Sequence, residues 1–334
     1  MTHLRILMGI LLAAVLATAA NAQGDGDEES APLSSATFEA FSLRNIGPAF
    51  MSGRIADIII VPDDPATWYV AVGSGGVWKT ENAGTTWTSL FDGQGSYSIG
   101  SLGADPSAPN RIWVGTGENH GGRHNGFGDG IYKSDDGGAT WEKKGLDASE
   151  HISKIIVHPD DSNTVWVASQ GPLWSPGGER GVYKTTHGGD TWTNVLAAGA
   201  YTGATDLFID PRNPDRLYAA RWQHHRTVAA YVGGGPESGL WKSEDGGDTW
   251  TELTTGLPDG NMGKIGLAIS PMDPDVLYAA IELDLREGGV WKSTDRGASW
   301  EKKSDMVSGG TGPHYYQELY ASPHHFDRIY LVSN

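Results

Sequence analysis

Short apolar runs alternate with polar and glycine-rich turns along most of the chain. One kind of run ends near a proline and leads, after a few polar residues, into an aromatic-centred run, as in Ile155–Ser169, Leu207–Arg221 and Leu267–Ile281. A second kind opens with glycine and continues as Val/Ile/Leu, Trp/Tyr and Lys. Because alternate residues of a strand face opposite sides, and short strands with regular turn signals mark all-β proteins, this pattern predicts an all-β fold.

An eight-residue stretch follows each glycine-opened strand, with the layout Ser/Thr-x-Asp-x-Gly-x-Thr/Ser-Trp. We call it the repeat turn. Its copies are Thr80–Trp87, Ser134–Trp141, Thr185–Trp192, Ser243–Trp250 and Ser293–Trp300. Their tryptophans are 50 to 58 residues apart, a spacing typical of repeat architectures. Four strands per repeat, which we name A to D, predict the blades of a β-propeller.

The repeat turn is predicted to be a structural hairpin turn between strands C and D. Its hydroxyl and carboxylate can bond backbone N–H groups, its glycines permit positive φ, and its tryptophan buries a large surface. Two copies carry Asn82 and His187 in place of Asp, which favours a turn former over a catalytic carboxylate. The predicted structural residues are Ser134, Asp136, Gly138, Trp141, Ser243, Asp245, Gly247, Trp250, Ser293, Asp295, Gly297 and Trp300.

The N-terminal residues differ in composition from the repeat region. Residues 1–22 have the layout of a signal peptide that is cleaved near Ala22, and residues 23–36 read as a disordered acidic linker. Residues 37–334 hold five complete blades and, in Leu319–Asn334, strands A and B of a sixth. Only Phe41–Ile46 could supply a closing strand. We therefore predict an incomplete propeller that forms an open arc and is a fragment of a longer protein.

Net charge limits the partners of this protein. The formal charge is −17, with 24 Lys and Arg against 41 Asp and Glu, and there is no cysteine. Nucleic acids and anionic membranes attract cationic surfaces, so neither is an expected partner. The signal predicts an exported protein, periplasmic, cell-surface or secreted, with no transmembrane segment in the mature chain. Without cysteine, stability must come from burial and strand pairing.

A candidate site lies on the loops opposite the repeat turns. In a propeller the B–C and D–A loops share one face, and three B–C loops are long and rich in His, Arg and aromatic residues. They span Gly117–Asp129, Ser169–Arg180 and Trp222–Ser238. The candidate ligand-binding residues are Glu118, His120, Arg123, His124, Trp174, Arg180, Trp222, His224, His225, Arg226, His314 and Tyr315. The alternative is that these loops only pack on one another.

The sequence indicates catalytic or metal-binding residues on this face less clearly than it indicates a binding surface. Glycoside hydrolysis needs two carboxylates, and the candidates are Glu118, Asp129, Glu179, Glu237 and Glu282. Glu118 is the best catalytic candidate, because a strand ends and a glycine-rich loop begins there. His120, His124, His224 and His225 could converge on zinc, but their spacing in glycine-rich loops indicates little. We expect no metal and no cofactor.

The repeat turn closely resembles the Asp box of the bacterial neuraminidase repeat. Residues from Phe41 to Asn334 resemble the sortilin-like N-terminal propeller of bacterial exported proteins, most specifically over Leu43–Ile58, Gly73–Trp87 and Trp113–Trp141. The resemblance implies a propeller longer than this chain. Such propellers include sialidases, xyloglucanase-type hydrolases, photosystem assembly factors and sorting receptors.

The catalytic residues of those enzymes are not matched here. The resemblance to xyloglucanase-type enzymes implies an Asp just before the Gly-Gly of blade one, where this chain has Ser74. The Arg-containing entry motif of sialidases is only loosely echoed by Phe41–Pro48, and we interpret Arg44 and Arg54 as salt-bridge or rim residues. We therefore expect a non-catalytic binding module for a protein, peptide or glycan. The alternatives are a glycoside hydrolase, xyloglucanase-like or sialidase-like, with catalytic residues partly beyond residue 334, and a scaffold without a small ligand.

Overall fold

The computed structural model describes residues 53–308 and 315–332, all within one unit that spans residues 50–334. The predicted signal peptide, acidic linker and closing strand, together with His314, lie outside the described residues.

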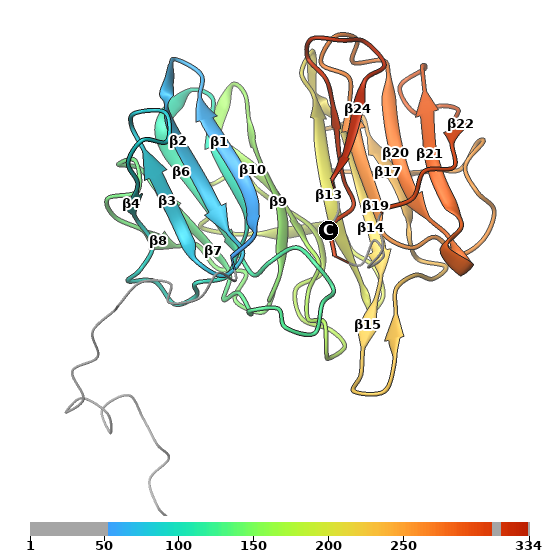
Figure 1. Cartoon of the computed structure of the whole chain (residues 1–334), viewed down its shortest axis with the longest axis horizontal. Coiled ribbons are helices and arrows are strands. Elements are labelled where there is room, and N and C mark those ends of the chain that lie inside the picture. The colour runs from blue at the N-terminus through green and yellow to red at the C-terminus, as the bar shows by residue number, and fades with distance from the viewer. Residues whose placement is uncertain (1–52, 309–314, 333–334) are drawn as a thin grey trace, which may run out of the picture. The chain divides into compact units, whose positions relative to one another are not determined.

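Antiparallel sheets make up nearly all of the described structure (Figure 1). Five sheets of the described residues have four strands each, and two have two strands each. Within each sheet the strands are neighbours in chain order, as predicted for blades with strands A to D. The all-β class and the four-stranded blades are therefore confirmed, while the total number of blades stays a prediction.

The first three blades are formed by residues 55–196. Blade 1 holds β1 (Ile55–Val61), β2 (Asp64–Val72), β3 (Gly76–Thr80) and β4 (Thr88–Ser89). Blade 2 holds β5 (Ile99–Asp105), β6 (Ala108–Thr116), β7 (Ile131–Ser134) and β8 (Glu142–Lys143). Blade 3 holds β9 (Ile152–His158), β10 (Asp161–Ser169), β11 (Gly181–Thr185) and β12 (Thr193–Leu196).

The remaining blades follow the same order. Blade 4 holds β13 (Thr202–Asp210), β14 (Asn213–Gln223), β17 (Gly239–Ser243) and β18 (Thr251–Leu253). Blade 5 holds β19 (Ile265–Ile269), β20 (Leu277–Glu282), β21 (Gly288–Ser293) and β22 (Glu301–Ser304), with the 3₁₀ turn η2 (Asp284–Arg286) before β21. Blade 6 holds β23 (Glu318–Ala321) and β24 (Ile329–Val332). An additional hairpin, β15 (His225–Arg226) with β16 (Tyr231–Val232), rises from the B–C loop of blade 4 and was not predicted.

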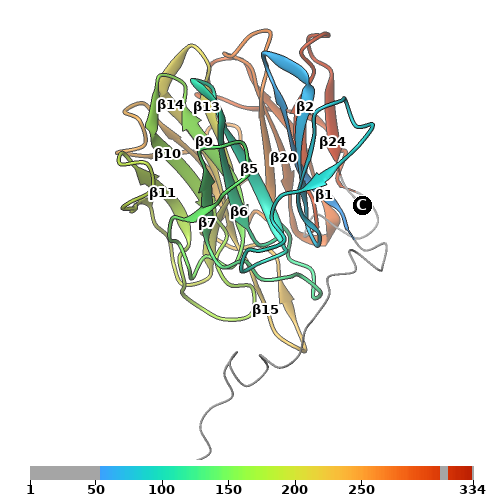
Figure 2. The same ribbon diagram turned by 90° about the vertical axis from the view of Figure 1, so that its left-hand side faces the viewer.

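The core lies between successive blades. The innermost strands β1, β5, β9, β13, β19 and β23 contact one another in that order, and Figure 2 shows several of them side by side. The aromatic residue at the centre of each B strand is buried in the first five blades, where it fills the layer against a neighbouring sheet. These residues are Tyr69, Trp113, Trp166, Tyr218 and Tyr278. The aromatic-centred pattern in the sequence therefore marks the core.

The outer faces of the first and last blades are different. Ile58 and Ile60 of β1 are about half exposed, and so are Tyr330 and Val332 of β24. The opposite faces of the same strands pack against blades 2 and 5. Two blade faces of the described structure therefore carry large exposed apolar side chains.

The repeat turns are held by their own side chains. Ser134 Oγ accepts hydrogen bonds from the N–H groups of Asp136 and Gly138, and Asp136 Oδ1 accepts one from Thr140 N at 2.8 Å. The turns of blades 4 and 5 repeat these bonds. Each turn also bonds the start of its B strand, for example Gly137 N to Asn110 O. All five turns therefore lie at the same end of their sheets, and their polar side chains are occupied.

Candidate functional site

The loops at the other end of the sheets form a second face, which we call the loop face. The B–C loop and the preceding D–A loop of one blade are joined by backbone hydrogen bonds, such as Gln170 N to His151 O and His224 N to Tyr201 O. Loops of different blades are joined as well, since Arg226 N donates to Leu173 O at 3.0 Å. The loop face is thus a connected surface rather than a set of independent loops.

Its centre is the segment Glu118–His124 of blade 2, which we call the central loop. Side chains from five other blades contact it, so it links blades that are far apart in the sequence. Arg54 of blade 1 and Tyr316 of blade 6 bind Glu118, and Gln170 of blade 3 binds Asn119. Arg226 of blade 4 donates to Gly121 O at 3.0 Å, and Lys264 of blade 5 donates to Asn119 O at 3.1 Å.

Glu118, the best catalytic candidate from the sequence, is buried at the base of the central loop. Arg54 Nε and Nη2 donate to its two oxygens at 2.5 Å, Tyr316 Oη donates at 2.5 Å, and His120 Nε2 lies 3.0 Å away. Burial would raise the pKa of this carboxyl, but the hydrogen bonds from His120, Arg54 and Tyr316 outweigh it and hold the pKa well below its usual range. Glu118 is therefore an ionised carboxylate whose oxygens are already bound.

Three histidines of the loop face, His120, His151 and His224, are also buried. Gly122 N donates to His120 Nδ1 at 2.8 Å, so the neutral ring carries its proton on Nε2, toward Glu118. Burial lowers the pKa of His151 to about 4, and burial keeps the pKa of His224 well below its ordinary value. His224 stacks on Trp222 with ring centroids 4.1 Å apart. Within the described part of the chain, no three His, Asp or Glu side chains are placed to hold one metal ion.

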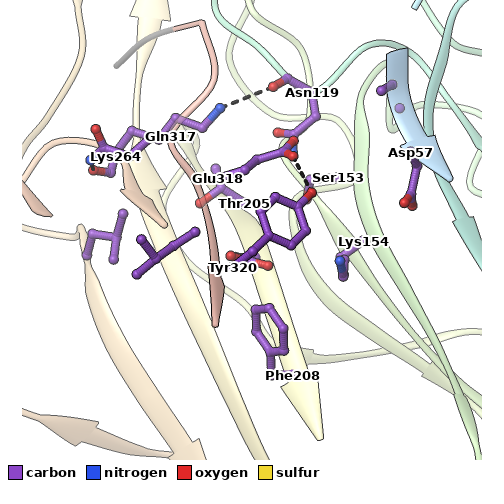
Figure 3. Close-up of a pocket in the computed structure, with 15 residues that line it drawn as sticks. Asp57, Asn119, Ser153, Lys154, Thr205, Phe208, Lys264, Gln317, Glu318 and Tyr320 are labelled. Atoms are coloured by element: carbon purple, nitrogen blue, oxygen red, sulfur yellow. Dashed lines mark hydrogen bonds between the residues drawn. The ribbon is translucent and has the colours of Figure 1, made fainter. Parts of the chain in front are cut away.

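Below the central loop, the innermost strands of all six blades line a narrow polar channel (Figure 3). Asp57, Lys154, Asp206, Lys264 and Glu318 face it. Asp57 Oδ2 accepts a hydrogen bond from Leu102 N, and Asp206 Oδ2 accepts one from Leu267 N, each in the next blade. These carboxylates therefore join neighbouring blades through hydrogen bonds to the backbone. Burial raises the pKa of Asp206 to about 6.

Exposed aromatic side chains mark the outer part of the loop face. Tyr97 is 66% exposed, Phe127 56%, Trp174 38% and Tyr201 36%. Ser96 Oγ donates to Phe127 O, which places the loops of Tyr97 and Phe127 side by side. Tyr201 and His225 lie with ring centroids 4.8 Å apart. These rings are open to a ligand that approaches from solvent.

The structure divides the candidate residues by depth. Glu118, His120, Arg180, Trp222, His224 and Arg226 are buried. Arg123, His124 and Trp174 are exposed, and His225 and Tyr315 are half-buried. A ligand resting on this face meets the second group first. Sequence reasoning did not single out Tyr97, Phe127 or Lys264, because single aromatic or basic residues in loops carry no pattern. The interpretation of Arg54 as a salt-bridge residue agrees with its ion pair to Glu118.

Similar proteins support this architecture. The Sortilin-Vps10 family, described as sortilin, neurotensin receptor 3, matches residues 129–259. A xyloglucanase from Paenibacillus sp. is 25% identical over 59% of this chain and 20% of its own length. A probable oligoxyloglucan-reducing end-specific xyloglucanase from Neosartorya fischeri is 26% identical over 60% of this chain and 24% of its own length. The chain thus spans about a quarter or less of these relatives.

Solved structures agree. An ancestral GH74 enzyme superposes with a TM-score of 0.60 at 20% identity, covering 81% of this chain and 33% of the other. The GH74 xyloglucanase from Xanthomonas campestris superposes with a TM-score of 0.52 at 16% identity, covering 83% of this chain and 50% of its own. Over the described residues, no helix has the length and apolar character needed to span a bilayer. The sheets and these matches together show a β-propeller fold, and residues 129–259 are similar to the Sortilin-Vps10 family.

Proposed function

We propose that this propeller is a carbohydrate-binding module of an exported protein and that its ligand rests on the loop face. The observation that carries the proposal is the set of exposed aromatic rings on that face, Tyr97, Phe127, Trp174 and Tyr201. Flat aromatic surfaces suit the apolar faces of sugar rings, and the hydroxyl of Tyr and the indole N–H of Trp can bond sugar hydroxyl groups. Export rests on the signal-like layout of residues 1–22.

Rigidity of the loops supports the same proposal. Arg180 Nη1 and Nε donate to the carbonyls of Gln170 and Gly177, which fixes the loop that carries Trp174. The hydrogen bond from His224 N to Tyr201 O fixes the loop that carries Tyr201. A binding surface whose loops are already ordered loses little conformational entropy when a ligand arrives. The xyloglucanase relatives act on a polysaccharide, which makes a glycan the first ligand class to test.

The test compares two tryptophans of equal exposure on opposite faces. Trp174 on the loop face is 38% exposed, and Trp87 in a repeat turn is 40% exposed. Xyloglucan oligosaccharides and acidic oligosaccharides are titrated into the wild-type chain, Trp174→Ala and Trp87→Ala, with calorimetry as the readout. We expect weaker binding for Trp174→Ala only. Equal affinities in the two variants, or no binding of any glycan, would contradict the proposal.

A glycoside hydrolase is the second candidate function, and Glu282 favours it. This carboxyl group lies at the loop-face end of β20, and burial raises its pKa to about 7. A carboxyl that stays protonated near neutral pH has the property required of a general acid. Glu118 lacks that property, because its oxygens bind Arg54 and Tyr316.

Release of reducing ends from xyloglucan, with wild-type, Glu282→Gln and Glu118→Gln chains, tests this second candidate. A general-acid role predicts loss of turnover in Glu282→Gln without a lower melting temperature. Turnover that is unchanged in Glu282→Gln would remove this residue from the mechanism. Turnover absent from the wild-type chain would leave the binding module as the function of this region.

A further inference from the structure

The hairpin β15–β16 extends from the loop face away from the sheets (Figure 1). We call residues 225–235, which hold this hairpin and the glycines after it, the strap. Its strands have two residues each, and residues 227–230 at its tip are exposed, with Val228 89% exposed. So short a hairpin is not stable by itself, and its position therefore depends on the contacts that fasten it to neighbouring loops.

Arg226 supplies the contacts that fasten the strap to the loops of blades 2 and 3. Its backbone N donates to Leu173 O at 3.0 Å, and its side-chain Nε donates to Gly121 O at 3.0 Å. Its guanidinium also stacks over the ring of Tyr231, 4.3 Å from the ring centre. Loss of the Arg226 side chain would therefore loosen the strap without removing any part of its backbone.

The base of the strap contains three consecutive glycines, at positions 233 to 235. Glycine has no Cβ and adopts a wide range of backbone angles, so the chain can rotate there at little steric cost. Gly235 N donates to Met262 O at 3.1 Å, which ties the end of this stretch to the segment before β19. Rotation about the first glycines would release the bonds of Arg226 and keep the bond of Gly235.

The strap covers the side chain of Trp222, which is fully buried. Trp222 Nε1 donates to Gly233 O at 2.8 Å, and the ring of Tyr231 lies edge-on to the indole with ring centroids 6.5 Å apart. Gly233 and Tyr231 both belong to the strap. Movement of the strap would therefore uncover an edge of the indole and release its N–H group.

His224 places an unused acceptor beside Trp222. The two rings are stacked with centroids 4.1 Å apart, and His224 Nδ1 lies 3.2 Å from Trp222 O. Burial keeps the pKa of His224 well below its ordinary value, so the ring is neutral. A carbonyl oxygen only accepts, so Nδ1 carries the proton and Nε2 is an acceptor. Nε2 is buried, and no described residue donates to it.

Lys264 places a cationic donor on the same indole. Its Nζ lies 5.5 Å from the centre of the Trp222 ring and donates to Asn119 O and Tyr315 O. An ammonium group has three N–H donors, so the contacts with described residues leave one.

The groups around Trp222 together suit a hydroxylated ring. A buried acceptor without a donor is costly, and a hydroxyl group, which donates and accepts, can satisfy it. The indole offers an N–H donor and an apolar surface, His224 offers an acceptor, and Lys264 offers a donor. Sugar rings combine apolar C–H surfaces with hydroxyl groups of both capacities.

We propose that the strap covers a deep sugar-binding subsite formed by Trp222, His224 and Lys264, and that it swings open about its glycines when a saccharide binds. This inference rests on the carbohydrate-binding function proposed above and adds a buried subsite to the exposed rings. Those rings meet the saccharide first, and the strap opens before a sugar unit reaches Trp222. The closed strap lowers the apparent affinity, because only the open fraction of the protein can fill the subsite.

The first measurement needs no substitution. Amide hydrogen exchange of the wild-type chain is followed by mass spectrometry with and without xyloglucan oligosaccharides. Saccharide binding should speed exchange in the strap, because Arg226 N loses its acceptor and the released hairpin is too short to protect its amides. A ligand that rests only on the exposed rings would slow this exchange or leave it unchanged.

Calorimetry on three variants then measures the affinity for the same saccharides. Arg226→Ala should speed strap exchange in the free protein and tighten binding about tenfold, because it loses the bond to Gly121 and raises the open fraction. His224→Phe keeps the stacking on Trp222, removes the Nε2 acceptor and should weaken binding about tenfold. Arg328→Ala, the control, removes an exposed arginine before β24 and should match the wild type in both measurements.

The outcomes separate this inference from the function on which it rests. Binding that weakens in Trp174→Ala but is unchanged in Arg226→Ala and His224→Phe overturns the covered subsite and keeps the carbohydrate module. Weaker binding in Arg226→Ala overturns the role of the strap as a cover. Slower or unchanged strap exchange in the saccharide complex of the wild type rejects the subsite even if a variant fails to fold. No binding of any saccharide overturns both proposals.

Discussion

Glu118→Gln is the substitution that best distinguishes a structural from a catalytic role for the central loop. The change keeps the shape of the side chain and removes its charge. It leaves the Arg54 guanidinium, whose side chain is 26% exposed, without its carboxylate partner. Tyr316 Oη can still donate to the amide oxygen, so that hydrogen bond is retained.

The expected magnitude follows from the burial of the two partners. Breaking a fully buried ion pair costs about 3–5 kcal/mol, and a solvent-exposed pair is worth about 1 kcal/mol or less. Glu118 is buried and Arg54 is partly exposed, so we expect a loss of about 2–3 kcal/mol. For a domain of this size that corresponds to a melting temperature lower by roughly 5–10 °C.

The pH dependence adds a second check. The folded-state pKa of Glu118 lies below its unfolded value, so its contribution to stability is present above the unfolded pKa, about 4.3, and is lost as pH falls further. The difference between wild type and Glu118→Gln should therefore be largest at neutral pH and shrink from about pH 5 to about pH 3.

Urea and thermal unfolding followed by circular dichroism measure both effects. Glu142→Gln is the matched control, because Glu142 pairs with Lys144 at the surface and its side chain is 68% exposed. This control should change stability by less than about 0.5 kcal/mol. The reasoning is refuted if Glu118→Gln unfolds like the wild type at neutral pH. Such a result, combined with loss of glycan hydrolysis, would return Glu118 to a catalytic role.

Three further changes follow from the structure. His187→Asp should stabilise blade 3 by about 0.5–1 kcal/mol, because the new carboxylate can accept the Thr191 N–H as Asp136 accepts that of Thr140; an unchanged urea midpoint would contradict this. Glu282→Gln should raise the melting temperature at pH 8 and not at pH 4. Because burial raises the pKa of Glu282 to about 7, the folded wild-type protein loses stability as the pH rises above the pKa of this group in the unfolded chain. Equal melting temperatures of the two proteins at pH 8 would argue against the burial of Glu282. Arg180→Met should speed amide hydrogen exchange across residues 170–178, because four carbonyls lose their donor, whereas Arg328→Met should not; protected amides in the first variant would show that the loop is held otherwise.

Local signals in the sequence were enough to predict the blades. Each strand of a blade pairs with the next one along the chain, as in Val165↔Thr185 to Ser169↔Gly181 between β10 and β11. Glycine at the start of strand C and the Ser-x-Asp turn after it fix this pairing over a few residues. Alternating apolar residues then decide which side of each sheet is buried. The five turns are also recognisable locally, since the hydrogen bonds that their Ser and Asp side chains accept from the backbone join residues at most four apart.

The burial of each loop side chain could not be predicted from the sequence. Trp222 and Trp174 both lie in or next to long aromatic-rich loops, yet the first is buried beneath the hairpin β15–β16 and the second is exposed. That hairpin has only two residues in each strand, too few to show a period. Exposure in these loops depends on which neighbouring loop covers which side chain.

The sequence by itself therefore determined the class of fold, the repeat and the face that carries the long loops, because strand pairing within a blade is local. Only the tertiary structure decided the role of each loop residue. Glu118 meets Arg54 from 64 residues away and Tyr316 from 198 residues away, and Arg226 meets Gly121 across 105 residues. Such contacts arise because the blades converge on one channel, and a convergence of six separate strands leaves no periodic signal in the chain.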